Sequence, residues 1–198
     1  MQKYDIDEVI VATKYHHNQI ELALNKYQIE ILFSSDLKIN THKLSKCVGT
    51  AQTLKSLSHK LDGGDFLFLD GDNLYNFDIE NYYNVHKNNG KIISILSHMT
   101  MEDGKYKNFI KYKNGSDKIE KIIVKPEYKL NKQLLATSGA CYLNPMIFNV
   151  IGNKDMCLFD NVIPKQLDNI SVILDNDSVQ FINTKQQYMS MSKNMEFV

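Results

Sequence analysis

Residues Asp65 to Leu74 read DFLFLDGDNL, a short apolar run that ends in two carboxylates around a glycine. A continuously apolar run of this length is typical of a strand that is buried on both faces of a parallel sheet. Charge beside a buried strand is costly unless it is solvated or bound, so Asp70 and Asp72 mark a candidate site. The plainer alternative is that Asp70, Gly71 and Asp72 only form a solvated turn after the strand.

The segments around this run alternate between strand and helix patterns, which predicts an α/β fold with a mainly parallel sheet. Asp78 is expected to cap one of the helices and Gly90 to end it. Polar residues predict a loop over 34–46. The predicted strands lie at 8–12, 29–33, 65–71 and 92–96, and the predicted helices at 18–26, 51–61 and 79–89.

The second half of the chain changes to a β-hairpin pattern, because Asn114-Gly115 is a turn signal between the apolar runs 109–113 and 119–124. We expect one domain over residues 1–198, a three-layer α/β sandwich with a Rossmann-like sheet plus a hairpin. The later elements are predicted as a strand at 138–143, a helix start at Asn144-Pro145, a helix at 160–167, two short strands and a helix from Thr184.

The composition excludes several classes of protein. Lysine plus arginine and aspartate plus glutamate each number 23, so no basic surface for nucleic acid is expected. The chain contains no arginine, so any phosphate held by a side chain must be held by lysine. Cys47, Cys141 and Cys157 lack metal-site spacing and predict reduced thiols in the cytoplasm. No apolar run approaches the roughly 20 residues of a membrane span, so a soluble protein is expected.

Two further segments carry candidate binding residues. VGTAQTL places Gly49 and Thr50 at a predicted helix N-terminus, where N–H groups attract anions, although a plain helix start is the commoner meaning of such a pair. Lys125 ends the predicted hairpin and is followed by Pro126 and later by ATSGACYLNP at 136–145. A lysine in this position is more often a solvated charge than a ligand.

These segments, in this order, resemble the sugar-phosphate nucleotidyltransferases of the GT-A type, which include glucose-1-phosphate thymidylyltransferases and mannose-1-phosphate guanylyltransferases. The resemblance rests on IDEVIVAT, VGTAQTL, FLFLDGDNL, and VKP followed by TSGACYLNP, and it covers nearly the whole chain. It implies that a sugar-1-phosphate oxygen attacks the α-phosphate of a nucleoside triphosphate and that pyrophosphate leaves. The implied cofactor is Mg²⁺.

The resemblance also implies a role for each matching residue. Asp72 would hold Mg²⁺ and Lys125 would hold the sugar phosphate, and these two are the implied catalytic residues. The implied nucleotide contacts are Gly49, Thr50, Gln52, Gly71 and Asp72, and the implied substrate contacts are Asn73, Lys125, Thr137 and Gly139.

The chain also departs from the family pattern. The first strand, the loop G-G-x-G-T-R-L and a following P-K pair are absent, so we expect either a start upstream of Met1 or a partner chain or second copy that supplies them. VQFINTKQQY resembles the family's W-x-D-I-G-T-P-E-D-Y, with Phe181 in place of the second metal aspartate and Asn183 in place of the glycine. Val124 stands where the family has the glutamate of E-K-P.

Three other functions stay open at this point. A non-catalytic relative would bind a nucleotide, a nucleotide-sugar or a partner subunit, and the residues at Phe181 and Val124 favour it. A metal-dependent glycosyltransferase would use Asp70-Gly71-Asp72 as a D-x-D motif, but this gives no reason for VGTAQTL. A choline-phosphate cytidylyltransferase also carries Asp and Asn at this strand end.

Overall fold

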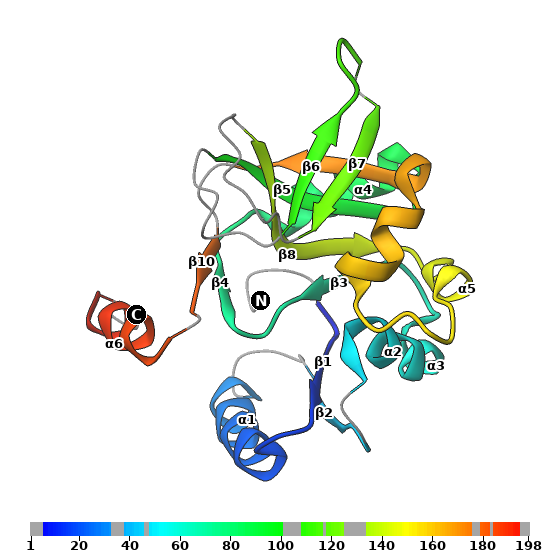
Figure 1. Cartoon of the computed structure of the whole chain (residues 1–198). Coiled ribbons are helices and arrows are strands. Elements are labelled where there is room, and N and C mark those ends of the chain that lie inside the picture. The colour runs from blue at the N-terminus through cyan, green and yellow to red at the C-terminus, as the bar shows by residue number, and fades with distance from the viewer. Residues whose placement is uncertain are drawn as a thin grey trace.

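A six-stranded sheet forms the centre of the protein (Figure 1). The computed structural model describes residues 6–32, 38–45, 48–100, 108–116, 118–124, 134–175, 179–182 and 184–194. The strand order is β7-β6-β8-β5-β9, and β3 also pairs with β8. The strands are β3 (Phe66–Leu69), β5 (Ile93–Thr100), β6 (Asn108–Tyr112), β7 (Ile119–Val124), β8 (Leu134–Leu143) and β9 (Ile170–Leu174).

The direction of β8 corrects the prediction of a mainly parallel sheet, because the sheet is mixed. β5 and β9 are parallel, with Ile93 opposite Ile170. β8 lies between β3 and β5 and is antiparallel to both. The sequence does not reveal this direction, since a strand that is covered on both faces is apolar whichever way it runs.

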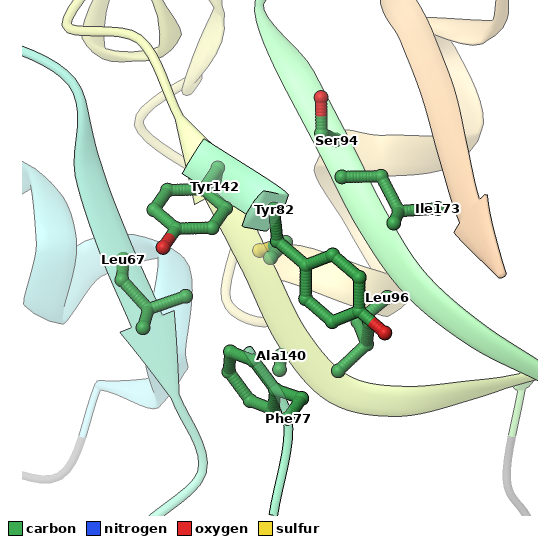
Figure 2. A pocket seen from close by; sticks show the side chains of 9 residues that line it. Leu67, Phe77, Tyr82, Ser94, Leu96, Ala140, Tyr142 and Ile173 are labelled. Atoms are coloured by element: carbon green, nitrogen blue, oxygen red, sulfur yellow. The ribbon is translucent and has the colours of Figure 1, made fainter. Parts of the chain in front are cut away.

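Helices cover both faces of the sheet and produce the three expected layers. On one face, α2 (Gly49–Ser56) and the π-helical turn η1 (Leu158–Val162) pack with Ile93 and Ile95 of β5. On the other face, α4 (Ile79–Asn89) packs Tyr82 against Leu96 and Ala140. The α4 side is closely packed, since the void beneath the helix has a volume of only ≈ 10 Å³ (Figure 2). That is about the space of one water molecule, so this void is not a ligand site.

The predicted boundaries of α4 are confirmed. The Asn81 N–H donates to the Asp78 carboxylate at 3.0 Å, and Gly90 ends the helix with a φ of 63°. The aspartate satisfies an N–H that has no partner within the helix, and the glycine adopts the left-handed conformation without strain. The predicted hairpin is confirmed as well, because β6 pairs with β7 around Asn114-Gly115.

A parallel pair of strands, β1 (Glu8–Thr13) and β2 (Lys38–Lys43), forms a separate sheet, with α1 (His17–Leu32) between them in the chain. The predicted strand at 29–33 is wrong, because the chain is helical up to Leu32, and the predicted loop at 34–46 contains β2. A short apolar run such as IEILF fits a helix as well as a strand. The sequence of β2, KINTHK, is too polar to indicate a strand by itself.

The remaining elements are short. The predicted helix at 160–167 is divided among η1, η2 (Ile163–Lys165) and η3 (Leu167–Asn169). β4 (Asn73–Tyr75) pairs with β10 (Val179–Phe181) in an antiparallel sheet of their own. No helix in the described ranges is both long and apolar enough to cross a membrane. The other helices are α3 (Ser58–Leu61), α5 (Ile147–Val150) and α6 (Lys185–Asn194).

Candidate functional site

The carboxyl end of β3 carries Asp70, whose carboxylate lies against Gly139 of β8. The Asp70 N–H donates to the Gly139 carbonyl at 3.1 Å, directly after the last β3–β8 residue pair. Gly139 has a φ of 76°, and a Cβ at this position would overlap the Asp70 carboxylate. Only glycine therefore allows both this backbone conformation and the close approach of Asp70.

Tyr75 holds the turn that follows β3 in place. Its hydroxyl accepts hydrogen bonds from the Asp70 N–H at 3.2 Å and from the Asn73 side-chain amide at 3.1 Å, and it donates to the Gly139 carbonyl at 3.2 Å. Burial is the main cause that raises the pKa of Tyr75 above its ordinary value, and the nearby Asp70 charge acts in the same direction. The Asn73 hydrogen bond partly opposes this shift. The phenol therefore stays protonated and remains a donor.

β8 has a break in its pairing at the segment predicted to contact substrate. β3 pairs with residues 140–143 and β6 with residues 135–136, so Thr137 to Gly139 have no strand partner on that edge among the described residues. The pairing with β5 on the other edge also shifts its register here. Irregular strand pairing of this kind is common beside binding sites, because it changes the direction of backbone groups.

Asp72 is exposed in the turn between β3 and β4. Its carbonyl accepts a hydrogen bond from the Ile182 N–H at 3.1 Å, and Phe181 lies opposite Asn73 in the β4–β10 pair. Phe181, which the resemblance aligns with the second metal aspartate, therefore lies beside this turn and has an apolar side chain. No cluster of three or more His, Cys, Asp or Glu side chains in the described residues is arranged to hold a metal. Mg²⁺ that is bound together with phosphates needs only one or two protein carboxylates, and Asp72 fits that requirement.

The predicted nucleotide segment at the start of α2 is bound to the loop that precedes η1. The Ala51 N–H donates to the Met156 carbonyl at 2.9 Å, and the Thr50 hydroxyl accepts from the Leu158 N–H at 2.9 Å. Gly49 has a φ of 77°, and a Cβ there would overlap the Met156 carbonyl. The glycine is therefore explained by packing against this loop.

The Gln52 side chain also binds the segment before η1. Its amide donates to the Gly152 carbonyl at 2.9 Å and to the Asp155 carbonyl at 2.7 Å. Asp155 is itself fixed, because Lys165 and the Gly152 N–H bind its carboxylate and lower its pKa. The predicted contact of Gln52 with a nucleotide is thus not tested by its position, but the structure gives its side chain a packing role.

A cavity of ≈ 810 Å³ connects β1, α2, β3 and the turn after β3. Asp70 and Tyr75 line it. The sequence marked Asp70 as part of a candidate site and as one carboxylate of the D-x-D alternative, but it assigned no role to Tyr75. Asp70 carries a signal, as the first residue after the apolar run, whereas nothing in the sequence marks Tyr75. Four of the predicted site residues line the cavity: Gly49, Thr50, Gly71 and Asn73. Asp72 lies in the chain between Gly71 and Asn73, whereas Gln52, Thr137 and Gly139 are not on the cavity wall. Lys125 lies outside the described residues.

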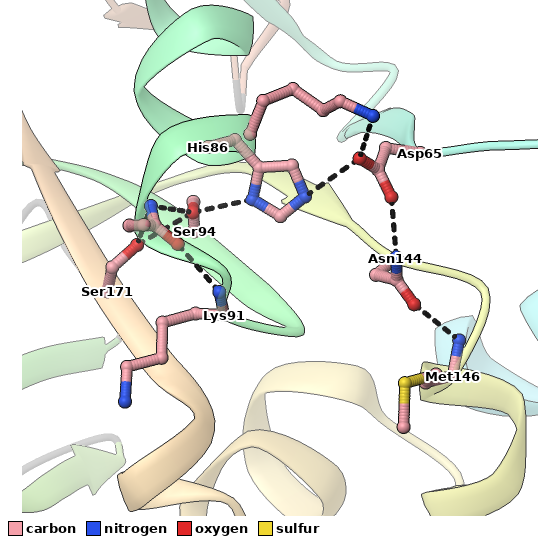
Figure 3. A network of polar contacts seen from close by, with 9 residues as sticks. Asp65, His86, Lys91, Ser94, Asn144, Met146 and Ser171 are labelled. Carbon is pink, nitrogen blue, oxygen red and sulfur yellow. Dashed lines mark hydrogen bonds and ion pairs between the residues drawn. The ribbon is translucent and has the colours of Figure 1, made fainter.

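A second polar cluster contains a serine, a histidine and an aspartate (Figure 3). His86 Nδ1 is 2.7 Å from Ser94 Oγ, and His86 Nε2 is 3.9 Å from the Asp65 carboxylate. Ser94 is only 1% exposed, and its Oγ is also 2.7 Å from Ser171 Oγ. Burial lowers the pKa of His86 below its ordinary value. The negative charge of Asp65 raises this pKa and so opposes the shift, whereas the positive charge of Lys87 lowers it further. A hydroxyl without access to solvent cannot attack a substrate, so this cluster stabilises the packing of α4 on the sheet.

Comparisons with known proteins identify similar sequences and similar folds. The family model of the nucleotidyl transferases matches residues 1–188. Mannose-1-phosphate guanylyltransferase 1 of Arabidopsis thaliana is 23% identical over 163 residues, which are 81% of this chain and 43% of that protein. The chain thus spans less than half the length of this curated relative.

Several solved structures share the fold. HddC from Yersinia pseudotuberculosis superposes with a TM-score of 0.76 at 13% identity, over 96% of this chain and 79% of HddC. The same protein in complex with GMP-PN superposes with a TM-score of 0.74 at 13% identity, over 98% of this chain and 80% of HddC. A Bacillus anthracis protein assigned as a glucose-1-phosphate thymidylyltransferase was solved in complex with sucrose. It superposes with a TM-score of 0.80 at 17% identity, over 100% of this chain and 80% of that protein. These likenesses confirm the Rossmann-like α/β class.

Proposed function

The chain belongs to the nucleotidyl transferase family, and from this we propose that its site binds a nucleoside triphosphate and a sugar-1-phosphate and transfers the nucleotidyl group between them. A phosphate oxygen of the sugar-1-phosphate attacks the α-phosphorus and forms a new P–O bond. The bond from the α-phosphorus to the bridging oxygen breaks, and pyrophosphate leaves with the electron pair. The products are a nucleoside diphosphate sugar and pyrophosphate.

The observation that carries this proposal is the position of Asp72. Its exposed carboxylate follows the end of β3, between Gly71 and Asn73, which line the cavity. In α/β sheets, ligands bind beyond the carboxyl ends of the strands. Mg²⁺, when bound, would neutralise the phosphate charge, and Asp72 is the residue that we propose to hold it.

Residues on the cavity wall and residues outside it are the remaining proposed binding groups. Gly49 and Thr50 line the cavity at the start of α2, and we propose that they contact the nucleotide, although the Ala51 N–H is already bound to the Met156 carbonyl. Thr137 and Gly139 lie in the break in β8 pairing, where we propose that they contact the sugar. Lys125 is the proposed cation for the sugar phosphate, and in a chain without arginine it acts as a point charge.

Two of the three cysteines lie in the described residues, and both are free thiols. Cys141 is buried and Cys157 is partly buried, and neither is part of a disulfide. Burial raises the pKa of the Cys141 thiol, which keeps it protonated and unreactive. Both cysteines therefore act as packing residues in this proposal.

A second candidate function is nucleotide binding without turnover. The apolar Phe181 beside the Asp72 turn favours it, because the metal would lack a second carboxylate. Removing one electrostatic group from such a site typically lowers the rate by on the order of 10²- to 10³-fold. A fast enzyme would keep measurable turnover after such a loss, whereas a slow enzyme would not. Binding and turnover therefore have to be measured separately.

Titration calorimetry with nucleoside triphosphates, with and without Mg²⁺, tests binding, and pyrophosphate release with sugar-1-phosphates tests turnover. We expect binding that depends on Mg²⁺ and is weakened in the Asp72→Asn variant. The Asp62→Asn variant is the matched control, because Asp62 is exposed before β3 and does not line the cavity. Binding without pyrophosphate release would favour the second candidate. Equal binding by Asp72→Asn and the native chain would refute the proposal.

A further inference from the structure

The chain contains two Asn-Gly pairs, Asn89-Gly90 at the end of α4 and Asn114-Gly115 between β6 and β7. An asparagine before a glycine can close a five-membered ring, because glycine has no Cβ to hinder the approach of its main-chain nitrogen to the asparagine Cγ. In a folded protein this reaction also requires an amide side chain that is free to move. The structure holds the two pairs very differently.

The side chain of Asn89 is fixed by three hydrogen bonds. Its amide donates to Ser94 Oγ at 3.0 Å and to Ser171 Oγ at 2.8 Å, and its carbonyl accepts from the Lys91 N–H at 2.8 Å. Each such bond lowers the population of the released side chain by about fivefold, so the three together lower it by about two orders of magnitude. Asn89 is therefore protected from ring closure.

Asn114 and Gly115 are both exposed at the tip of the β6–β7 hairpin, which projects away from the rest of the molecule (Figure 1). Within the described residues, neither the Asn114 side chain nor the Gly115 N–H makes a hydrogen bond. The turn is closed on either side of them, by the Ser116 N–H that donates to the Lys113 carbonyl at 3.1 Å. A Cβ at Gly115 would meet nothing within 4 Å, so there is space for a reaction at its nitrogen.

We propose that Asn114-Gly115 is a site of spontaneous deamidation in the folded protein, with water as the co-reactant. The Gly115 nitrogen gives its proton to solvent base, attacks the Asn114 Cγ and forms a new C–N bond. The bond from Cγ to the side-chain nitrogen breaks, and this nitrogen takes up a proton and leaves as ammonia. Water then adds to one of the two ring carbonyls and breaks a ring C–N bond, which leaves aspartate or isoaspartate at position 114.

The reaction changes both the charge and the backbone of the hairpin tip. Residues 111–121 contain four lysines and two acids, so one new carboxylate halves their formal positive charge. The same lysines favour the deprotonated nitrogen that attacks. Aspartate is compatible with the turn, whereas isoaspartate adds a methylene to the main chain and should weaken the hydrogen bond between Ser116 and Lys113. The inference does not rest on the proposed function.

Incubation of the full chain in mildly alkaline buffer made with heavy-oxygen water tests this proposal. Digestion at acidic pH in ordinary water and mass spectrometry then locate the label, and any reaction during digestion leaves none. In the folded chain we expect Asn114 to be labelled on the order of 10²-fold faster than Asn89. In urea the two pairs should react at similar rates, because Asn89 loses its hydrogen bonds.

The Asn114→Gln variant makes the test specific. Glutamine keeps an exposed amide at the same position but needs a larger ring, so the labelling at position 114 should disappear while that at Asn89 stays unchanged.

Three results would overturn the proposal: labelling of Asn114 in urea but not in the folded chain, equal labelling of Asn114 and Asn89 in the folded chain, or unchanged labelling at position 114 in Asn114→Gln. No nucleotide is used, so failure of this proposal and failure of the proposed function are distinguishable.

Discussion

Replacing Gly49 by alanine should destabilise the protein more than the same change at Gly90. Both glycines have a positive φ, 77° and 63°, so each alanine would carry the left-handed penalty of about 1–2 kcal/mol. A Cβ at Gly90 meets nothing within 4 Å, whereas a Cβ at Gly49 overlaps the Met156 main chain. Forcing such an overlap costs about 1–3 kcal/mol more, and a shift of Met156 would also strain its hydrogen bond to the Ala51 N–H.

The comparison of the two variants isolates the packing contribution. Alanine lowers the entropy of the unfolded chain equally at both positions, so this effect cancels in the difference. Urea denaturation of the native chain and both variants gives the free energies of unfolding. We expect Gly49→Ala to be less stable than Gly90→Ala by about 1–3 kcal/mol. Equal losses would refute the close contact between the start of α2 and Met156, and with it the packing explanation of the VGTAQTL glycine.

Three further predictions concern the turn and the buried cluster. Tyr75→Phe should lower the free energy of unfolding by about 0.5–1.5 kcal/mol, because three hydrogen bonds depend on the hydroxyl, and urea denaturation at constant pH will show whether it does. Phe181→Asp should raise the affinity for Mg²⁺ in calorimetry, and an unchanged affinity would contradict its position beside Asp72. The pKa of His86 lies below its ordinary value of 6.5 in the folded state, so the unfolded chain binds more protons. The free energy of unfolding should therefore fall as the pH drops below about 6.5, by at most about 1.4 kcal/mol per pH unit, and His86→Gln should remove this slope.

The parts of the fold that the sequence predicted correctly depend on short-range interactions. The cap at Asp78, the end of α4 at Gly90 and the hairpin around Asn114-Gly115 each involve residues a few positions apart. Phe66–Leu69 was recognised as a strand because four consecutive apolar residues can be covered on both faces. Such features are set by local backbone preferences, which a single sequence displays directly.

The parts that the sequence missed depend on partners that are distant in the chain. The hydrogen-bond partners of Thr50 and Gln52 lie about a hundred residues later, at Leu158, Gly152 and Asp155, and the sequence did not reveal them. The predicted ligand contacts of these two residues stay predictions. The antiparallel direction of β8 and the polar strand β2 also follow from long-range pairing. The Asp72 turn was located from its neighbours in sequence, whereas Tyr75 and the cavity wall of β1 became visible only in three dimensions.

The position of β8 in the chain also bears on how the protein is made. β3, β5 and β6 all pair with β8, but all three are synthesised before it. Phe66 and its partner Leu143 are more than 70 residues apart. A ribosome that adds about 5–20 residues per second needs several seconds to cover that distance. The nascent chain therefore holds apolar strands with open edges for that interval, when binding by a chaperone would best protect it from aggregation.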